Sequence, residues 1–385
     1  MPGPEFLPRP RRIRRGAALT LVFAGVLATA AATDGLPRDG GKTSRPLAAR
    51  AAAATVDRDD VARAAAEAMA DGKSGTKAAE AVVSRSGDRW GAVYDKSEYA
   101  EFEQALDGEY TGVGLGARRA ADGRVEVARV QPGGPADKAG IKAGDRLRTV
   151  DGLDVDKRPV TDVVALLRGG DRTSVVLGLE RDGRKWAETL LRARLTTEAV
   201  TVQHLDGGAV MIKVASFTKG SGAKVRNAVR AAPAGAGVLL DLRGNAGGLV
   251  AEAVTAASAF LDGGLVATYD IRGEQRALYA TAGGNTERPV VALVDGGTMS
   301  AAELVTGALQ DRGRAITVGW RTFGKGSVQM PSRLPDGSVA ELTVGHYRTP
   351  AGHSVDGRGI TPDLMAGKGA EKRAETVLSG LGGGS

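Results

Sequence analysis

Short apolar runs alternate with helical repeats in the second half of the chain. Residues 238–240 and 290–294 are unbroken runs of Val, Leu and Ala, which is typical of short buried strands. Each run is followed by a glycine-containing turn and then by apolar residues at helical spacing, over 249–260 and from residue 300 onward. This alternation predicts an α/β core over residues 195–366, which is large enough to bury its own hydrophobic centre.

An earlier segment follows a helical pattern alone. Val61, Ala65 and Met69 recur at helical spacing, and Trp90 has the bulk of a packing residue. We therefore predict an N-terminal helical segment over residues 55–108. The pattern leaves two roles open, a simple strut or an element through which two copies of the chain associate.

The first residues have the layout of an export signal. Five arginines precede an apolar run over 17–32, which contains small residues suited to cleavage near Ala30. The run is shorter than the roughly 20 residues of a membrane span, although an uncleaved anchor stays an alternative. We predict a signal peptide or signal anchor over residues 1–32 and a flexible linker over 33–54. The protein is then secreted or anchored at the outer face of the bacterial cytoplasmic membrane.

Charge and cysteine content narrow the classes of function. The formal net charge of the chain is +7, of which residues 1–32, with five Arg and one Glu, account for +4. The remaining residues carry a net charge of about +3, which does not require a nucleic-acid partner. The chain has no cysteine, which excludes disulfides, a thiol nucleophile and cysteine-based metal sites.

Ser300 lies where a predicted strand turns into a predicted helix. The first N–H groups of a helix have no partner within it, and the helix dipole favours an anion there. This position suits a hydroxyl that attacks a carbonyl group and then stabilises the resulting oxyanion. The alternative is that Ser300 only caps the helix, as most serines at such positions do.

Lys325 lies in a glycine-flanked loop, R-T-F-G-K-G-S-V-Q, between two strand-like runs. A lysine acts as a base only when its amine is desolvated enough to lose its proton near neutral pH. Gly324 and Gly326 permit close backbone approach, and Phe323 and Val328 can exclude water. The alternative is a solvated loop lysine. The chain has only three histidines, none near the candidate serine in sequence, so a Ser-His-Asp triad has no local support.

A glycine-rich turn follows the strand at 238–240, in the sequence D-L-R-G-N-A-G-G. The paired glycines Gly247 and Gly248 can expose a backbone N–H group to a ligand without steric cost. For Asp241 and Arg243 we favour a structural ion pair over a catalytic role.

The segments 298–315 and 322–329 together resemble the carboxyl-terminal processing proteases, which are Ser-Lys endopeptidases with a built-in PDZ domain. The resemblance implies that Ser300 is the nucleophile, Lys325 the general base and Gln329 the residue that assists the lysine. It also implies no metal and no cofactor.

The same resemblance assigns the oxyanion hole to the N–H of Ala301 and to the turn formed by Gly247 and Gly248. The sequence does not show which glycine donates. Met299 departs from the small residue usual in the family, which adds bulk beside the nucleophile without removing a reacting group.

Residues 109–194 resemble a PDZ domain. The sequence Y-T-G-V-G-L-G resembles the loop that binds a peptide's terminal carboxylate, and the strand after it can pair with the peptide by β-augmentation. The implied substrates are proteins with apolar C-termini, and the domain is expected to gate the site. The candidate groove residues are Gly112, Val113, Gly114, Leu115, Gly116, Val164, Leu167 and Arg168.

The predicted fold is a crotonase-like or ClpP-like α/β protease core with an inserted PDZ domain. The PDZ domain is expected to be β-sandwich-like with two helices. Residues 367–385 are assigned to a C-terminal tail. The predicted function is an exported serine endopeptidase that recognises and cleaves proteins near their C-termini. Two alternatives remain, a catalytically silent PDZ scaffold in the cell envelope and an acyl-transfer enzyme of crotonase-like architecture.

Overall fold

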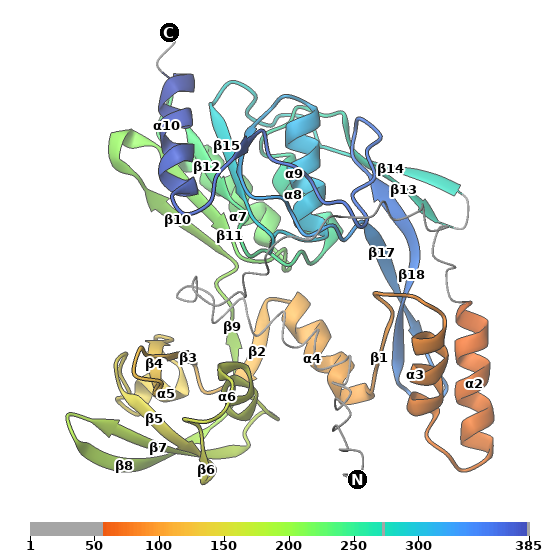
Figure 1. Ribbon diagram of the computed structural model, residues 1–385, viewed down its shortest axis with the longest axis vertical. Helices are drawn as coiled ribbons and strands as arrows, with labels where there is room; N and C mark the ends of the chain where they lie inside the picture. The colour runs from red at the N-terminus through yellow and green to blue at the C-terminus, as the bar shows by residue number, and fades with distance from the viewer. Residues whose placement is uncertain (1–56, 272–273, 383–385) are drawn as a thin grey trace, which may run out of the picture.

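The computed structural model describes residues 57–271 and 274–382. The predicted leader over 1–32 and linker over 33–54 lie outside these residues. Figure 1 shows a large α/β body, a lobe of short strands below it at the left and a pair of N-terminal helices at the lower right, with a further helix between the lobe and the pair. No helix among the described residues combines the length and apolar character needed to cross a membrane.

A sheet of six strands forms the centre of the α/β body within the described residues. Five strands run parallel, and the edge strand β10 is antiparallel to its neighbour. The prediction of an α/β core is confirmed. In spatial order the strands are β10 (Val200–His204), β11 (Val210–Val214), β12 (Val238–Asp241), β15 (Val290–Val294), β16 (Ile316–Gly319) and β19 (Leu364–Met365).

Helices cover both faces of this sheet, which explains why β12 and β15 are apolar at every position except the last residue of β12. One face packs against α7 (Ser221–Ala231), α8 (Val250–Ala257) and α9 (Ala301–Asp311). The other face packs against α10 (Ala370–Gly382). The assignment of 367–385 to a tail is therefore wrong for most of its length. Ala370, Ala374 and Leu378 repeat every four residues and are buried against the sheet.

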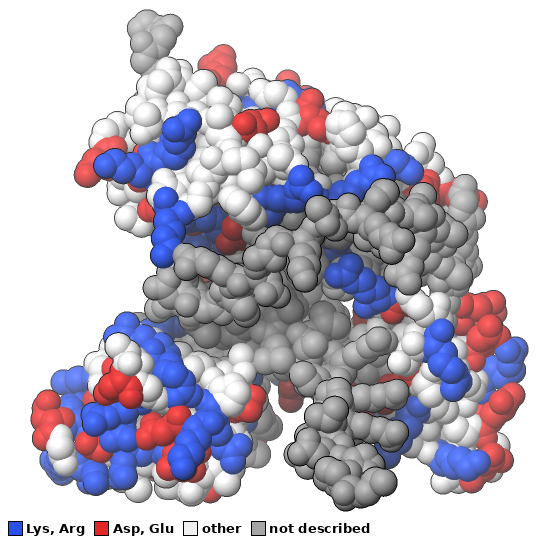
Figure 2. Space-filling model, viewed as in Figure 1, with Lys and Arg blue, Asp and Glu red and all other residues white. Residues whose placement is uncertain are grey.

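The lower-left lobe in Figure 1 is an insertion between two adjacent strands. Strands β2 (Glu109–Gly112) and β9 (Ala193–Thr196) pair antiparallel, so the chain enters and leaves the lobe side by side. Between them lie α5 (Pro135–Lys138), α6 (Val160–Leu167), β3 (Leu115–Arg119), β4 (Val125–Val130), β5 (Arg146–Val150), β6 (Leu153–Asp154), β7 (Ser174–Arg181) and β8 (Arg184–Leu191). Figure 2 shows basic and acidic side chains interleaved on the visible face of this lobe.

A second sheet joins the N-terminal segment to the α/β body. Helices α2 (Arg58–Ala70) and α3 (Gly75–Arg85) pack against strand β18, and α4 (Lys96–Leu106) leads into β2. The segment predicted to be helical also contains a short strand, β1, which pairs with β18. The strands of this sheet are β1 (Ala92–Tyr94), β13 (Leu265–Ile271), β14 (Glu274–Tyr279), β17 (Ser327–Arg333) and β18 (Val339–Arg348).

Close contact between β13 and β18 depends on Gly345. A Cβ atom added there would lie 1.5 Å from the backbone oxygen of Asp270, so the Gly345→Ala variant must separate the strands. We expect a loss of unfolding free energy of about 1–3 kcal/mol, as for other overpacked sites. Urea unfolding of the wild type and of this variant measures the difference in unfolding free energy. Gly367→Ala, where an added Cβ meets nothing within 4 Å, is the control, and equal stability of the two variants would contradict this packing.

Candidate active site

Ser300 has a strained backbone. It joins β15 to α9 with φ 56° and ψ −120°, a combination that costs a non-glycine residue roughly 1–3 kcal/mol. Hydrogen bonds hold the residue at both of its backbone groups. Its N–H donates to Glu303 Oε2 at 3.0 Å, and its carbonyl oxygen accepts from the Tyr347 hydroxyl at 2.9 Å. The strain therefore persists because the surrounding structure fixes this turn.

Glu303 links the serine turn to the lysine loop. Its side chain is fully buried on α9, three residues after Ser300. Besides the Ser300 N–H, its carboxylate accepts the N–H of Lys325 at 2.9 Å, the N–H of Gly324 at 2.7 Å and the hydroxyl of Thr322. Burial raises the pKa of Glu303 above its usual value, although these hydrogen bonds oppose the rise.

Lys325 is covered by an aromatic ring from the N-terminal segment. Its Nζ lies 5.0 Å from the centre of the Trp90 indole, and the Phe323 ring packs against the same indole at 5.7 Å. Burial lowers the pKa of Lys325, and the nearby carboxylates of Glu341 and Asp88 oppose this shift. Burial in turn raises the pKa of Glu341 to about 7, an effect that Lys325 opposes. Both shifts favour the neutral forms of this pair.

The structure does not join the predicted catalytic side chains by hydrogen bonds. Among the described residues, no side-chain hydrogen bond connects Lys325 to Ser300 or to Gln329. The Gln329 side-chain amide instead donates to Ser327 Oγ at 2.7 Å and to Thr343 Oγ1 at 3.3 Å. In this arrangement Gln329 is a neighbour of the lysine loop without holding the lysine side chain.

The paired glycines lie against the nucleophile. Gly247 and Gly248 have φ values of 98° and 130°, and a Cβ on Gly247 would lie 2.9 Å from Ser300 Cβ and 3.1 Å from the nitrogen of Ala301. The Gly247 N–H donates to the side chain of Asn245 at 2.8 Å. Within the described residues, the N–H groups of Gly248 and Ala301 have no acceptor. Of the two glycines, Gly248 therefore carries the free donor.

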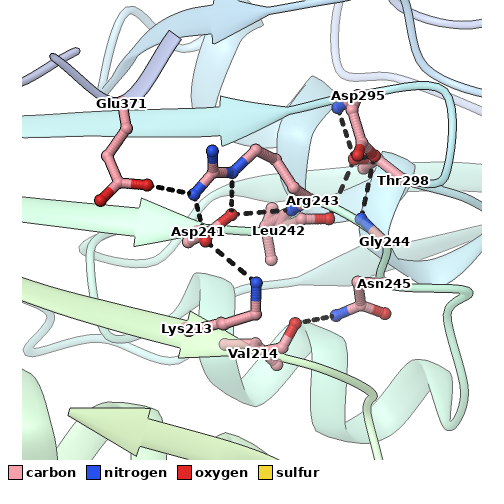
Figure 3. Close-up of polar contacts among 10 residues, drawn as sticks. All are labelled: Lys213, Val214, Asp241, Leu242, Arg243, Gly244, Asn245, Asp295, Thr298 and Glu371. Carbon is pink, nitrogen blue, oxygen red and sulfur yellow. Dashed lines mark hydrogen bonds and ion pairs between the residues drawn. The ribbon is translucent and has the colours of Figure 1, made fainter. Parts of the chain in front are cut away.

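Buried polar side chains fix this turn against the loop before Ser300 (Figure 3). Asn245 is fully buried and donates its side-chain amide to the carbonyl oxygen of Val214 at 2.9 Å. Asp295 accepts the N–H of Gly244 at 2.9 Å, and the Thr298 hydroxyl donates to the carbonyl oxygen of Leu242 at 2.9 Å. The ends of β11, β12 and β15 are thus held together next to the nucleophile.

An ion-pair network precedes the glycine turn and confirms the predicted pairing of Asp241 with Arg243 (Figure 3). The buried Asp241 carboxylate accepts from Arg243 Nε at 2.8 Å and from Lys213 Nζ at 3.2 Å. Arg243 also bonds Glu371 of α10 at 2.8 Å. Burial alone would raise the pKa of Asp241, but the Arg243 hydrogen bonds and the two positive charges hold it below its usual value.

The predicted groove residues of the inserted lobe lie together. Between β3 and α6 they surround a small pocket of about 20 Å³, and two of its lining residues, Gly112 and Arg168, pair as an antiparallel bridge. The Arg168 guanidinium lies 5.6 Å from the centre of the Tyr110 ring and is half-buried. The lining includes all the residues predicted for the groove, namely Gly112, Val113, Gly114, Leu115, Gly116, Val164, Leu167 and Arg168.

Comparison with known proteins places this architecture in a family. The model for peptidase family S41 matches residues 209–366, and a PDZ-domain model matches residues 126–181. A solved structure titled photosystem II D1 C-terminal processing protease is 31% identical to this chain. The similarity covers 80% of this chain and 86% of that chain, with a TM-score of 0.50. The chain belongs to peptidase family S41.

Two curated relatives match most of this chain at a level of sequence identity close to that of the solved structure. The carboxy-terminal processing protease CtpA of Bacillus subtilis is 31% identical over 72% of this chain and 61% of its own length. The carboxyl-terminal-processing protease of Synechocystis is 34% identical over 69% of this chain and 65% of its own length. The chain thus spans less than two thirds of the length of these relatives.

Sequence reasoning missed several residues that shape the site. Glu303 lies in the 298–315 segment, where the sequence gives it no role in the site, and the sequence predicts only packing for Trp90. Asn245 lay in the glycine-turn motif without a role. Glu341 carried no local signal, because only the pairing of β17 with β18 brings it toward the lysine loop. The described residues contain no cluster of three or more His, Cys, Asp or Glu side chains suited to a metal ion.

The Asp241 network should make stability depend on acidity. Folding lowers the pKa of Asp241, so its carboxylate contributes to the free energy of unfolding at pH values above the usual carboxyl pKa of about 3.9. This contribution is lost as the pH falls below that value. We expect Asp241→Asn to cost about 2 kcal/mol at pH 7, since it removes the buried charge that accepts hydrogen bonds from Arg243 and Lys213. Urea unfolding at pH 7, 5, 4 and 3 should show this difference shrinking below about pH 4. A difference that stays constant over the range would contradict the assignment.

Proposed function

We propose that this protein is a serine endopeptidase that cleaves polypeptides by a Ser-Lys mechanism after its PDZ domain recognises their C-termini. The observation that carries the proposal is the shared contact of Glu303 with Ser300 and Lys325. It brings a strained serine at a helix N-terminus beside the loop of a desolvated lysine. The family and the names of the relatives support the same chemistry.

In the proposed reaction, neutral Lys325 accepts the proton of the Ser300 hydroxyl as the oxygen attacks the scissile carbonyl carbon. The carbonyl π electrons move to its oxygen, which accepts hydrogen bonds from the N–H groups of Gly248 and Ala301. The C–N bond then breaks, and the Lys325 ammonium returns its proton to the leaving amine. Water, deprotonated by Lys325, then attacks the acyl carbon, the bond between this carbon and the Ser300 oxygen breaks, and the Lys325 ammonium returns the proton to that oxygen.

Gln329 is proposed to orient the amine of Lys325 during the reaction. In the structure its amide bonds Ser327 and Thr343, and the lysine amine lies over the indole. Formation of the working dyad therefore requires these side chains to change rotamer. Such changes fit the proposal that the PDZ domain gates the site when substrate binds.

The proposed substrates are proteins with apolar C-termini. The terminal carboxylate would bind the backbone N–H groups of the loop at 112–116, and the peptide would add a strand beside β3. Val164 and Leu167 of α6 provide apolar walls for the terminal side chain. Together with the predicted export signal, this suggests processing of secreted or envelope proteins outside the cytoplasmic membrane.

The dyad predicts a defined dependence on pH. Cleavage of an unfolded protein with an apolar C-terminus should rise between pH 6 and 10 as Lys325 loses its proton. The midpoint of kcat/KM should lie below the usual lysine pKa of about 10.4, because burial disfavours the ammonium. Ser300→Ala and Lys325→Ala should each lower kcat/KM by at least about 10³-fold.

Controls separate this proposal from its rivals. The same protein with an acidic C-terminal residue should be cleaved less, because it does not match the apolar groove. Full activity of Lys325→Ala would assign the base to another residue. Binding of the C-terminus without cleavage by wild type at any pH would instead favour the PDZ scaffold.

A further inference from the structure

Trp90 belongs to a part of the chain outside both matched family models. It lies in the loop between α3 and β1, whereas the PDZ model matches 126–181 and the S41 model matches 209–366. Its indole nevertheless covers the Lys325 amine, with Nζ 5.0 Å from the ring centre. The Arg89 guanidinium lies 4.7 Å from the same ring. The N-terminal segment therefore supplies one wall of the lysine pocket.

The position of this wall is fixed by Asp88. Its buried carboxylate accepts the N–H of Trp90 at 3.0 Å and the N–H of Gly91 at 2.8 Å. It also accepts both the N–H and the hydroxyl of Thr343 on β18, at 2.9 and 2.8 Å. One carboxylate thus attaches the loop that carries the indole to the strand beside the lysine loop. Hydrogen bonds therefore fix the backbone that carries the indole, and the ring itself packs against Phe323.

The ring acts on the lysine in two opposing ways. A cation over an indole face gains up to about 2 kcal/mol, which favours the ammonium. Exclusion of water favours the neutral amine, and burial is the largest influence on the pKa of Lys325, which it lowers. The charged groups around the amine and its loop are Glu341 of β18, Asp88 and Arg89 of the 88–91 loop, Glu303 of α9 and Asp356, which accepts the N–H of Gly326.

We propose that Trp90 is a positioning residue for the general base, whose indole holds the Lys325 amine and shields it from water. The inference rests on the proposed Ser-Lys mechanism. It gives the N-terminal segment a role beyond that of a strut, because the segment completes the pocket of the base. The catalytic site is then assembled from elements that precede and follow the PDZ domain.

The test measures the pKa of Lys325 in the full chain without requiring turnover. Acetic anhydride labels neutral amines, so the extent of Lys325 acetylation against pH, read by mass spectrometry, reports its titration. We expect Trp90→Ala to raise the midpoint by about one unit or more as water enters the pocket. Trp90→Phe, which keeps an aromatic face, should stay near wild type. Trp90→Leu, which keeps apolar cover but removes the ring face that attracts the ammonium, should titrate below the wild-type midpoint.

The pH profile of kcat/KM should shift in the same direction, with Trp90→Ala losing most activity near pH 7 and recovering part of it at higher pH. The matched control is Trp186→Ala, which removes an indole that lies 5.5 Å from the Arg181 guanidinium in the PDZ domain. It should leave the labelling midpoint of Lys325 unchanged. Thermal unfolding of each variant identifies any that do not fold, in which case Trp90→Leu and Trp90→Phe carry the comparison.

Two failures are distinguishable. If Trp90→Ala and Trp90→Leu both keep the wild-type midpoint and pH profile while Ser300→Ala and Lys325→Ala are inactive, the inference about Trp90 is wrong and the dyad stands. If Lys325→Ala keeps full turnover, the Ser-Lys mechanism is wrong, and Trp90 then positions no general base.

Discussion

A single buried carboxylate on α9 controls the relative position of the two loops that carry the proposed reacting groups. Glu303 accepts one N–H from Ser300 and two from the lysine loop, at Gly324 and Lys325. Folding raises the pKa of this acid, so its ionisation costs folding free energy as the pH rises above the usual carboxyl value. Burial of this acid is unfavourable in itself, and the hydrogen bonds that it accepts fix the geometry of both loops.

The rest of the site depends on turns at the ends of neighbouring parallel strands. The glycine turn after β12 and the serine turn after β15 meet because those strands are adjacent in the sheet. The side chains of the buried Asn245 and the half-buried Asp295 then accept backbone N–H groups of the glycine turn, those of Gly247 and Gly244. Among the residues that the structure describes, the N–H groups of Gly248 and Ala301 beside Ser300 have no acceptor, as the proposed oxyanion hole requires.

Much of this arrangement could be predicted from local sequence. The apolar runs of β12 and β15, the glycine pair and the positions of Ser300 and Lys325 all have signals within about ten residues, because strand, turn and helix propensities are local. Contacts between segments far apart in the chain had no such signal. Trp90 reaches Lys325 only through the pairing of β1 with β18, and Glu341 only through the pairing of β17 with β18. The local sequence also does not show that Gly247 donates its N–H to Asn245 while Gly248 does not, because that depends on the three-dimensional path of the turn.

The most direct test of this account is kcat for the Glu303→Gln variant, measured beside Glu252→Gln. Glu252 is a matched control, because its carboxylate also accepts two backbone N–H groups, from Gly220 and Gly222, at the start of α7. A glutamine at 303 keeps the size of the side chain but replaces one acceptor oxygen with a donor, which displaces one of the two loops. The account predicts that Glu303→Gln folds and loses about 10²-fold in kcat, while Glu252→Gln stays near wild type. A folded Glu303→Gln protein with the wild-type kcat would contradict it.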